Sequence, residues 1–166
     1  NNLERWGVTT PVSSLKFIEE VPVSGGVLDE VFFGSTKIRL RIKGYFQEEF
    51  LCKMGSVCIP PAKMRAYQIV RHANNKNIFR EISPELIVVN PVHFLGYLAY
   101  VQVLSETFFG ISVYDTPEVI ALAIGAHRKV NLMRAVLSGS LWNLYAEDAY
   151  NLHAWRMGTH VVSRGL

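Results

Sequence analysis

The sequence predicts an α/β fold with at least one parallel β-α-β unit, and three observations in the middle of the chain carry this prediction. Residues 86–89, LIVV, are a fully apolar run of the kind that is buried on both faces of a parallel sheet. Asn90-Pro91 supplies a helix cap and a first-turn proline, so a helix is expected at 91–106. Residues 111–114 form a second strand-like run, and two strands joined by a helix lie parallel with a right-handed crossover.

One further strand and three further helices complete the expected domain. Residues 36–43, TKIRLRIK, alternate between apolar and basic side chains, which is typical of a strand with one buried face. The patterns at 62–73, 117–128 and 140–157 predict helices. An α+β arrangement stays open. Residues 130–137, VNLMRAVL, fit either a helix or a strand.

The last expected helix, 140–157, begins at a capping serine, Ser140. Its apolar stripe contains one acid, Asp148. A carboxylate on a buried face needs a partner, for which Arg134, a tyrosine hydroxyl or a backbone N–H would serve, and a catalytic role is the alternative.

The length of 166 residues suits one domain with a sizeable core. Prolines, paired glycines and the lack of a sustained period predict an extended arm at 1–30, followed by a single α/β domain at 31–158 and a tail at 159–166. The apolar fraction is high at 49% and the charged fraction low at 19%, which favours a chain that buries part of its surface in a larger assembly. Two cysteines favour a reducing intracellular compartment, the cytoplasm or an organelle matrix.

The helix expected at 91–106 has no polar face, because apolar residues surround its helical wheel. The segment at 117–128 is nearly as apolar, and one domain of this size rarely covers two such helices. We therefore expect other protein subunits to cover the first helix at an interface formed by Phe94, Tyr97, Tyr100, Val101 and Leu104. Residues 86–105 also reach the length of a membrane span, against which Asn90, His93 and other polar side chains count.

Basic residues gather in two places that suit contact with nucleic acid. One is the outward face of the strand at 36–43, and the other is the helix expected at 62–73. The candidate residues are Lys37, Arg39, Arg41, Lys43, Lys63, Arg65 and Arg71. The row on the strand has two interpretations: a solvated face paired across a Gly44 turn with Glu48 and Glu49, or a track for the phosphate backbone of RNA or DNA.

The carboxyl ends of the expected parallel strands are where an open α/β sheet places its ligands. There, His93 as a base oriented by Asp115, with Asn90 beside it, would form an acid–base site. These three residues are the catalytic candidates, although helix capping alone accounts for Asn90. The sequence has no glycine-rich phosphate loop and no metal-ligand spacing of histidines and cysteines, so neither a cofactor nor a metal is expected.

Two resemblances to known families fall on this part of the chain. ELIVVNPVH, residues 85–93, resembles the self-cleaving Asn-Pro-Thr-His segment of the flagellar and type III secretion export-switch proteins, with Val92 in place of threonine. Residues 63–157 resemble the kink-turn-binding ribosomal proteins in their expected element order, which implies an α/β/α sandwich and an RNA partner. Residues 65–68 depart from that family's RNA-contacting signature. Because two unrelated families fit the same stretch, neither is assigned.

The cation row and the apolar helix together predict a non-catalytic subunit of a larger assembly that contacts RNA, as a ribonucleoprotein component does. The alternative is a protein-only structural subunit, such as a capsid or respiratory-complex component. A second alternative is a small α/β enzyme acting at the carboxyl ends of its parallel strands. The net charge of +3 is compatible with a nucleic-acid partner and does not require one.

Overall fold

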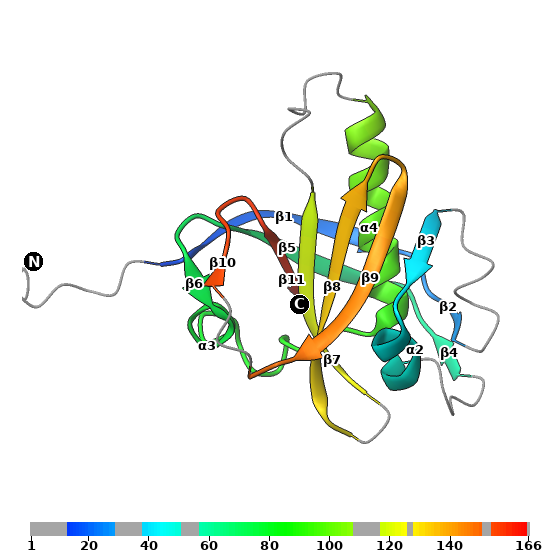
Figure 1. The fold of residues 1–166 in the computed structure, drawn as a ribbon, viewed down its shortest axis with the longest axis horizontal. Coiled ribbons are helices and arrows are strands. Elements are labelled where there is room, and N and C mark those ends of the chain that lie inside the picture. Colours follow the sequence, from blue (N-terminus) through cyan, green and yellow to red (C-terminus); the bar gives the residue numbers. More distant parts are fainter. Residues whose placement is uncertain are drawn as a thin grey trace, which may run out of the picture.

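The computed structural model describes residues 13–28, 38–50, 57–107, 117–125, 128–150 and 154–165. Its main feature is a seven-stranded mixed sheet in the order β1-β5-β11-β7-β8-β9-β3 (Figure 1). These strands are β1 (Leu15–Val23), β3 (Arg39–Ile42), β5 (Ala62–Ile69), β7 (Glu118–Ile124), β8 (Val130–Ser138), β9 (Leu141–Asp148) and β11 (His160–Arg164). The helices are α2 (Gly44–Phe50), α3 (Asn75–Phe79) and α4 (Pro91–Thr107). The predicted α/β class is confirmed.

Two small sheets flank the main one. β2 (Gly26–Leu28) pairs with β4 (Val57–Ile59), and β6 (Ala73–Asn74) pairs with β10 (Ala154–Trp155), both in antiparallel fashion. Residues 13–28 and 159–165, expected in an N-terminal arm and a C-terminal tail, thus supply β1, β2 and β11. β11 lies inside the main sheet, antiparallel to β5 and parallel to β7.

The main sheet curves around α4, which packs against its inner face (Figure 1). Side chains from both halves of the sheet meet the helix, and α2 closes the same core. The core residues include Val21, Met64 and Val162 from one half, Val119, Met133 and Trp142 from the other, and Phe46, Phe94 and Leu98 from the helices. Successive side chains of a strand point to opposite faces of the sheet, so every second residue of β9 from Trp142 to Ala146 is buried.

A second core covers part of the outer face of the sheet. There α3 and β10 pack against the middle strands, and the chain that follows α3 adds further apolar side chains. The members include Ile78, Phe79, Ile120, Leu132, Trp155 and Val161. Because β7 lies between the two cores, its residues from Glu118 to Ala123 are all buried.

The start of α4 is as expected. Asn90 caps the helix, its side-chain Oδ1 accepting a hydrogen bond from the Val92 amide at 2.9 Å, and Pro91 is the first helical residue. The predicted strand at 86–89 is reduced to a single parallel bridge between Val88 and Leu122 of β7. The parallel crossover through α4 therefore exists, with β7 as its second strand. The strand expected at 111–114 lies outside the described residues.

Three predicted helices are wrong, and each is a strand. Within the helix expected at 62–73, residues Ala62–Ile69 form β5, where Met64, Ala66 and Ile69 are buried between more exposed neighbours. Within the helix expected at 117–128, residues Glu118–Ile124 form β7, whose continuous apolar run is that of a central strand rather than a buried helix. Within the helix expected at 140–157, the described residues form β9 (Leu141–Asp148) and β10 (Ala154–Trp155).

The error at 140–157 has a specific cause. Its residues fit the helical period by coincidence, but Gly139, with φ at +63°, turns the chain into a hairpin between β8 and β9. Ser140 lies in that hairpin loop and caps no helix. Asp148, expected on a buried face, is exposed, and its carboxylate accepts a hydrogen bond from the Tyr150 amide.

Candidate nucleic-acid interface

The outer face of β3, β9 and β8 carries the predicted cation row. β3 is the edge strand and pairs in parallel with β9, so Arg39 lies beside Leu141 and Arg41 beside Asn143. The next strand continues the rows, with Ser138 opposite Leu141 and Val136 opposite Asn143. Paired residues share a sheet face, and all of these side chains are exposed or half-buried. Here we refer to this surface as the β3–β9 face.

The opposite side chains of β3 explain why the cations point outward. Leu40 and Ile42 pack against the core around α4. Arg39 and Arg41 alternate with them and are exposed, as the sequence predicts for a strand with one apolar face. Lys37 lies outside the described residues.

Within the described part of the chain, Arg39, Arg41 and Lys43 form no salt bridge. Arg39 donates a hydrogen bond from Nη1 to the Ser140 hydroxyl at 3.2 Å. The expected pairing across Gly44 is not formed, because residues 44–50 are the helix α2 rather than a returning strand. Arg39 and Arg41 are thus exposed and Lys43 is half-buried, and none of the three is neutralised by a salt bridge in the described part of the chain.

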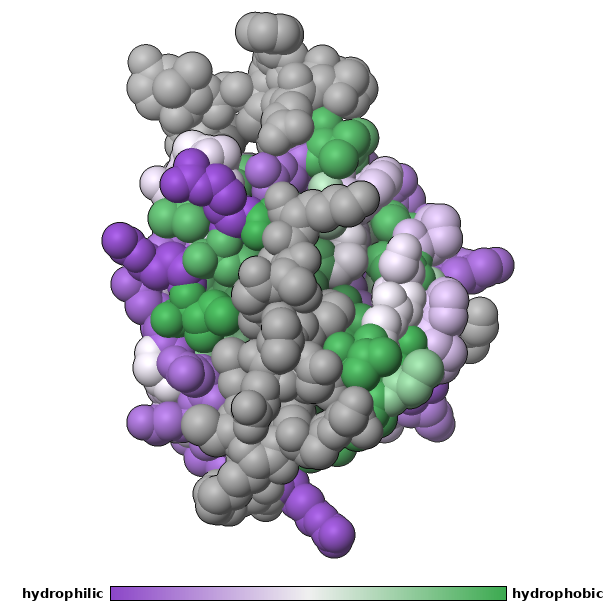
Figure 2. Space-filling view, turned by 90° about the vertical axis from the view of Figure 1, so that its right-hand side faces the viewer, coloured by the Kyte–Doolittle hydropathy of each residue, from purple (hydrophilic) through white to green (hydrophobic). Residues whose placement is uncertain are grey.

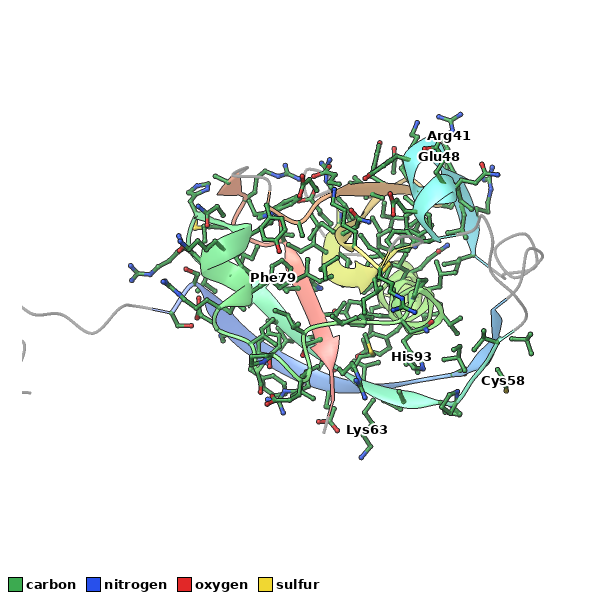
Figure 3. The ribbon with its side chains drawn as sticks, turned by 90° about the horizontal axis from the view of Figure 1, so that it is seen from below. Arg41, Glu48, Cys58, Lys63, Phe79 and His93 are labelled. Atoms are coloured by element: carbon green, nitrogen blue, oxygen red, sulfur yellow. The ribbon has the colours of Figure 1, made fainter. Side chains whose placement is uncertain are left out.

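Glu49, one of the two acids expected to pair with the row, points into the protein instead. Its carboxylate accepts a hydrogen bond from Asn131 Nδ2 at 2.9 Å, and both side chains are buried. Glu48 is exposed on α2 (Figure 3). The left part of Figure 2, which corresponds to the side facing the reader in Figure 1, shows strongly hydrophilic and hydrophobic residues next to one another.

Tyr145 marks the inner limit of the β3–β9 face. Its ring lies between two cations, with Lys43 Nζ 5.8 Å and the Arg134 guanidinium 5.3 Å from the ring centroid. Arg134 is held by Glu118 and Glu147, at 2.9 and 3.2 Å. Burial works to lower the pKa of the Arg134 guanidinium, but these two carboxylates raise it above its usual value. Arg134 therefore belongs to an internal ion network, unlike the cations of β3.

The second group of predicted cations lies elsewhere. Figure 3 shows Arg41 and Lys63 on opposite sides of the molecule. Lys63 and Arg65 of β5 share one acid, Glu20, at 3.7 and 4.0 Å. The Arg65 guanidinium also stacks 4.4 Å from the centroid of the Phe17 ring. Arg71 is exposed beyond the end of β5. The seven predicted residues do not form one continuous surface.

The three catalytic candidates do not form an acid–base site in the described structure. His93 is buried, and its Nε2 lies 2.7 Å from the Pro60 carbonyl oxygen, which ties α4 to the turn before β5. Asn90 caps α4, and Asp115 lies outside the described residues. His93 and Asn90 do line a cavity of about 390 Å³, with Arg164 at its wall.

The predicted partner interface on α4 is mostly covered by the chain itself. Phe94, Tyr97 and Val101 are buried in the core, so these three need no partner to cover them. The reason is that strands from both halves of the main sheet pack around the helix and cover it (Figure 1). Tyr100 and Leu104 are half-buried and line a larger cavity. No helix in the described ranges is both long and apolar enough to span a membrane.

Sequence reasoning missed the residues that β9 and β8 add to the face, because it assigned residues 140–157 to a helix and left 130–137 open between a helix and a strand. Leu141, Asn143 and Tyr145 follow a period of two, which was the available signal.

Comparisons with protein-family models, with curated proteins and with solved structures found no match to this chain. The element order also differs from the sandwich implied by the ribosomal-protein resemblance, since β5 replaces its first helix.

Proposed function

We propose that this protein binds single-stranded RNA on the β3–β9 face, as a non-catalytic subunit of a larger assembly. The observation that carries the proposal is the row of Arg39, Arg41 and Lys43, which has no salt-bridge partner in the described part of the chain. Same-face side chains on a strand recur at about 6.6 Å, so the cations are spaced along a line that suits contact with the phosphates of an extended nucleic-acid strand. Phosphate contacts of this kind supply affinity that does not depend on base sequence.

The surface beside the row favours an unpaired strand over a duplex. Leu141, Val136 and Asn143 form a half-exposed strip of the sheet, and no described element covers it. Unpaired bases offer flat apolar surfaces and free hydrogen-bonding edges, which suit aliphatic side chains and an amide. The phosphates would lie along β3 and the bases over β9 and β8.

Salt-dependent binding tests the proposal. Affinity for a fluorescently labelled oligouridylate is measured between about 50 and about 200 mM salt. Three phosphate contacts predict that log K falls with log salt with a slope of about −2 for a single strand. The double variant R39Q/R41Q removes two of the contacts, so its slope falls to about −0.7. K76Q/R80Q removes two exposed cations of the α3 region and leaves the slope unchanged. Wild-type affinity that ignores ionic strength contradicts the proposal.

A protein-only structural subunit is the second candidate, and the exposed side chains of the β2–β4 sheet favour it. Val27 and Val57 are 45% and 49% exposed on neighbouring strands, and a protein partner that packs there would cover this apolar surface. The mass of the native particle and its ratio of absorbance at 260 and 280 nm separate the two candidates. A particle rich in nucleic acid supports the first, and a particle of protein alone supports the second.

A further inference from the structure

A cavity of about 570 Å³ opens beside α4, at the end of the sheet where β7 and β11 begin. Its walls come from five parts of the chain that are separated in sequence. They include Glu19 of β1, Gln68 of β5, Tyr97 and Tyr100 of α4, and His160 of β11. Val101, Leu104 and Pro117 add apolar surface. The size and the mixture of apolar walls with a few polar groups are those of a small-molecule site.

A β-bulge aims Glu19 into this cavity. The pairing of β1 with β5 shifts between Phe17 and Glu19, where Ile18 is the extra residue. Before the bulge, Leu15 belongs to the outer core, whereas after it Val21 belongs to the inner core. Glu19 shares the face of Val21, so the bulge transfers this carboxylate from the outer face to the inner one.

Two hydrogen bonds fix the polar groups of the cavity. The Tyr100 hydroxyl donates to Glu19 Oε1 at 2.8 Å, which leaves Oε2 without a described donor. The Tyr97 hydroxyl lies 3.0 Å from His160 Nδ1. Burial raises the pKa of the Tyr97 hydroxyl far above its usual value, and burial lowers the pKa of the His160 imidazole. Burial thus keeps the Tyr97 hydroxyl protonated and disfavours the charged form of the His160 imidazole.

The other carboxylate at the cavity, that of Glu118, is already occupied. One of its oxygens accepts a hydrogen bond from the Thr159 hydroxyl at 3.0 Å, and the other accepts from Arg134 at 3.0 Å. Arg156, which also lines the cavity, is exposed, so solvent screens its charge. Glu19 is thus the carboxylate with hydrogen-bonding capacity to spare.

We propose that this cavity binds a small primary amine with an aromatic or aliphatic body. The ammonium group would donate to the free oxygen of Glu19 and lie near the rings of Tyr97 and Tyr100, whose centroids are 6.1 Å apart. The body of the ligand would lie against Val101, Leu104 and Pro117. A ligand of the same shape without the positive charge loses the ion pair and keeps the apolar contacts.

The probes for the test are 2-phenylethylamine and its neutral isostere 2-phenylethanol, titrated calorimetrically into the full chain. We expect the amine to bind at least about tenfold more tightly than the alcohol, the difference of one charge-assisted hydrogen bond. E19Q retains an oxygen that accepts from Tyr100, so it keeps the fold, and it removes this preference. E20Q is the matched control, because Glu20 pairs with Lys63 and Arg65 on the other face. No binding of the amine, equal binding of both probes, or an equal loss in E20Q overturns the proposal.

Discussion

Nη2 of Arg134 lies 2.9 Å from Oε2 of Glu118, whose side chain is 5% exposed. This pair joins the two central strands β7 and β8 on the outer face of the sheet. Thr159, just before β11, donates to the other oxygen of Glu118. The pair therefore connects the cation-bearing half of the sheet to its C-terminal strand.

Replacing Glu118 by glutamine is expected to destabilise the fold by about 2 kcal/mol, because it leaves a partly buried guanidinium with a weaker acceptor. The control is E147Q, which removes the more exposed partner of Arg134 and costs less than about 1 kcal/mol. Urea unfolding at neutral pH measures both. Equal losses in the two variants would show that the buried pair has no special role.

His160 makes stability depend on pH. Burial lowers the pKa of its imidazole in the folded state, while the unfolded value is the ordinary one of about 6.5. Below about pH 6.5 the unfolded chain therefore binds a proton that the folded chain does not, so stability is lost as the pH falls through this range. In H160Q we expect a smaller loss of unfolding free energy between about pH 7.5 and about pH 5 than in the wild type. H72Q, a change at an exposed histidine, serves as the control, and an identical pH dependence in H160Q and the wild type contradicts the assignment.

Gly125 stands where a side chain does not fit. A Cβ at this position would lie 2.3 Å from Glu49 Oε2 and 2.7 Å from Asn131 Nδ2. Both groups are buried and bonded to each other, so Gly125→Ala displaces them and costs about 1 to 3 kcal/mol. Gly44→Ala meets no atom within 4 Å and is expected to leave stability unchanged or raise it by up to about 1 kcal/mol. Thermal unfolding of both variants tests this, and a Gly125→Ala variant as stable as Gly44→Ala refutes it.

Local sequence signals predicted the elements that have a clear capping residue or a clear alternation of side chains. The Asn90-Pro91 pair marked the start of α4, because a cap and a first-turn proline act through their own backbone. The alternation around Arg39 and Arg41 predicted both a strand and its outward cations. These features depend on neighbours within a few residues, and the structure confirms them.

The remaining errors arose where burial rather than local sequence sets the structure. The run from Glu118 to Ile124 is apolar because both of its faces are covered, and an apolar run fits a buried helix equally well. The bulge at Ile18 follows from pairing with a strand more than forty residues away, so no local sequence pattern predicts it. The cavity around Glu19 and His160 was missed for the same reason. The β3–β9 face was found in part, through its edge strand alone.

Mapping the RNA contact by nuclear magnetic resonance tests the central proposal most directly. Backbone amide shifts of the full chain are followed while an oligouridylate is added at low salt. The account predicts shifts at residues 39–43 and 136–145, no shifts at residues 63–69, and loss of the response in R39Q/R41Q. Shifts confined to β1 and β5, or no shift at any RNA concentration, would contradict it.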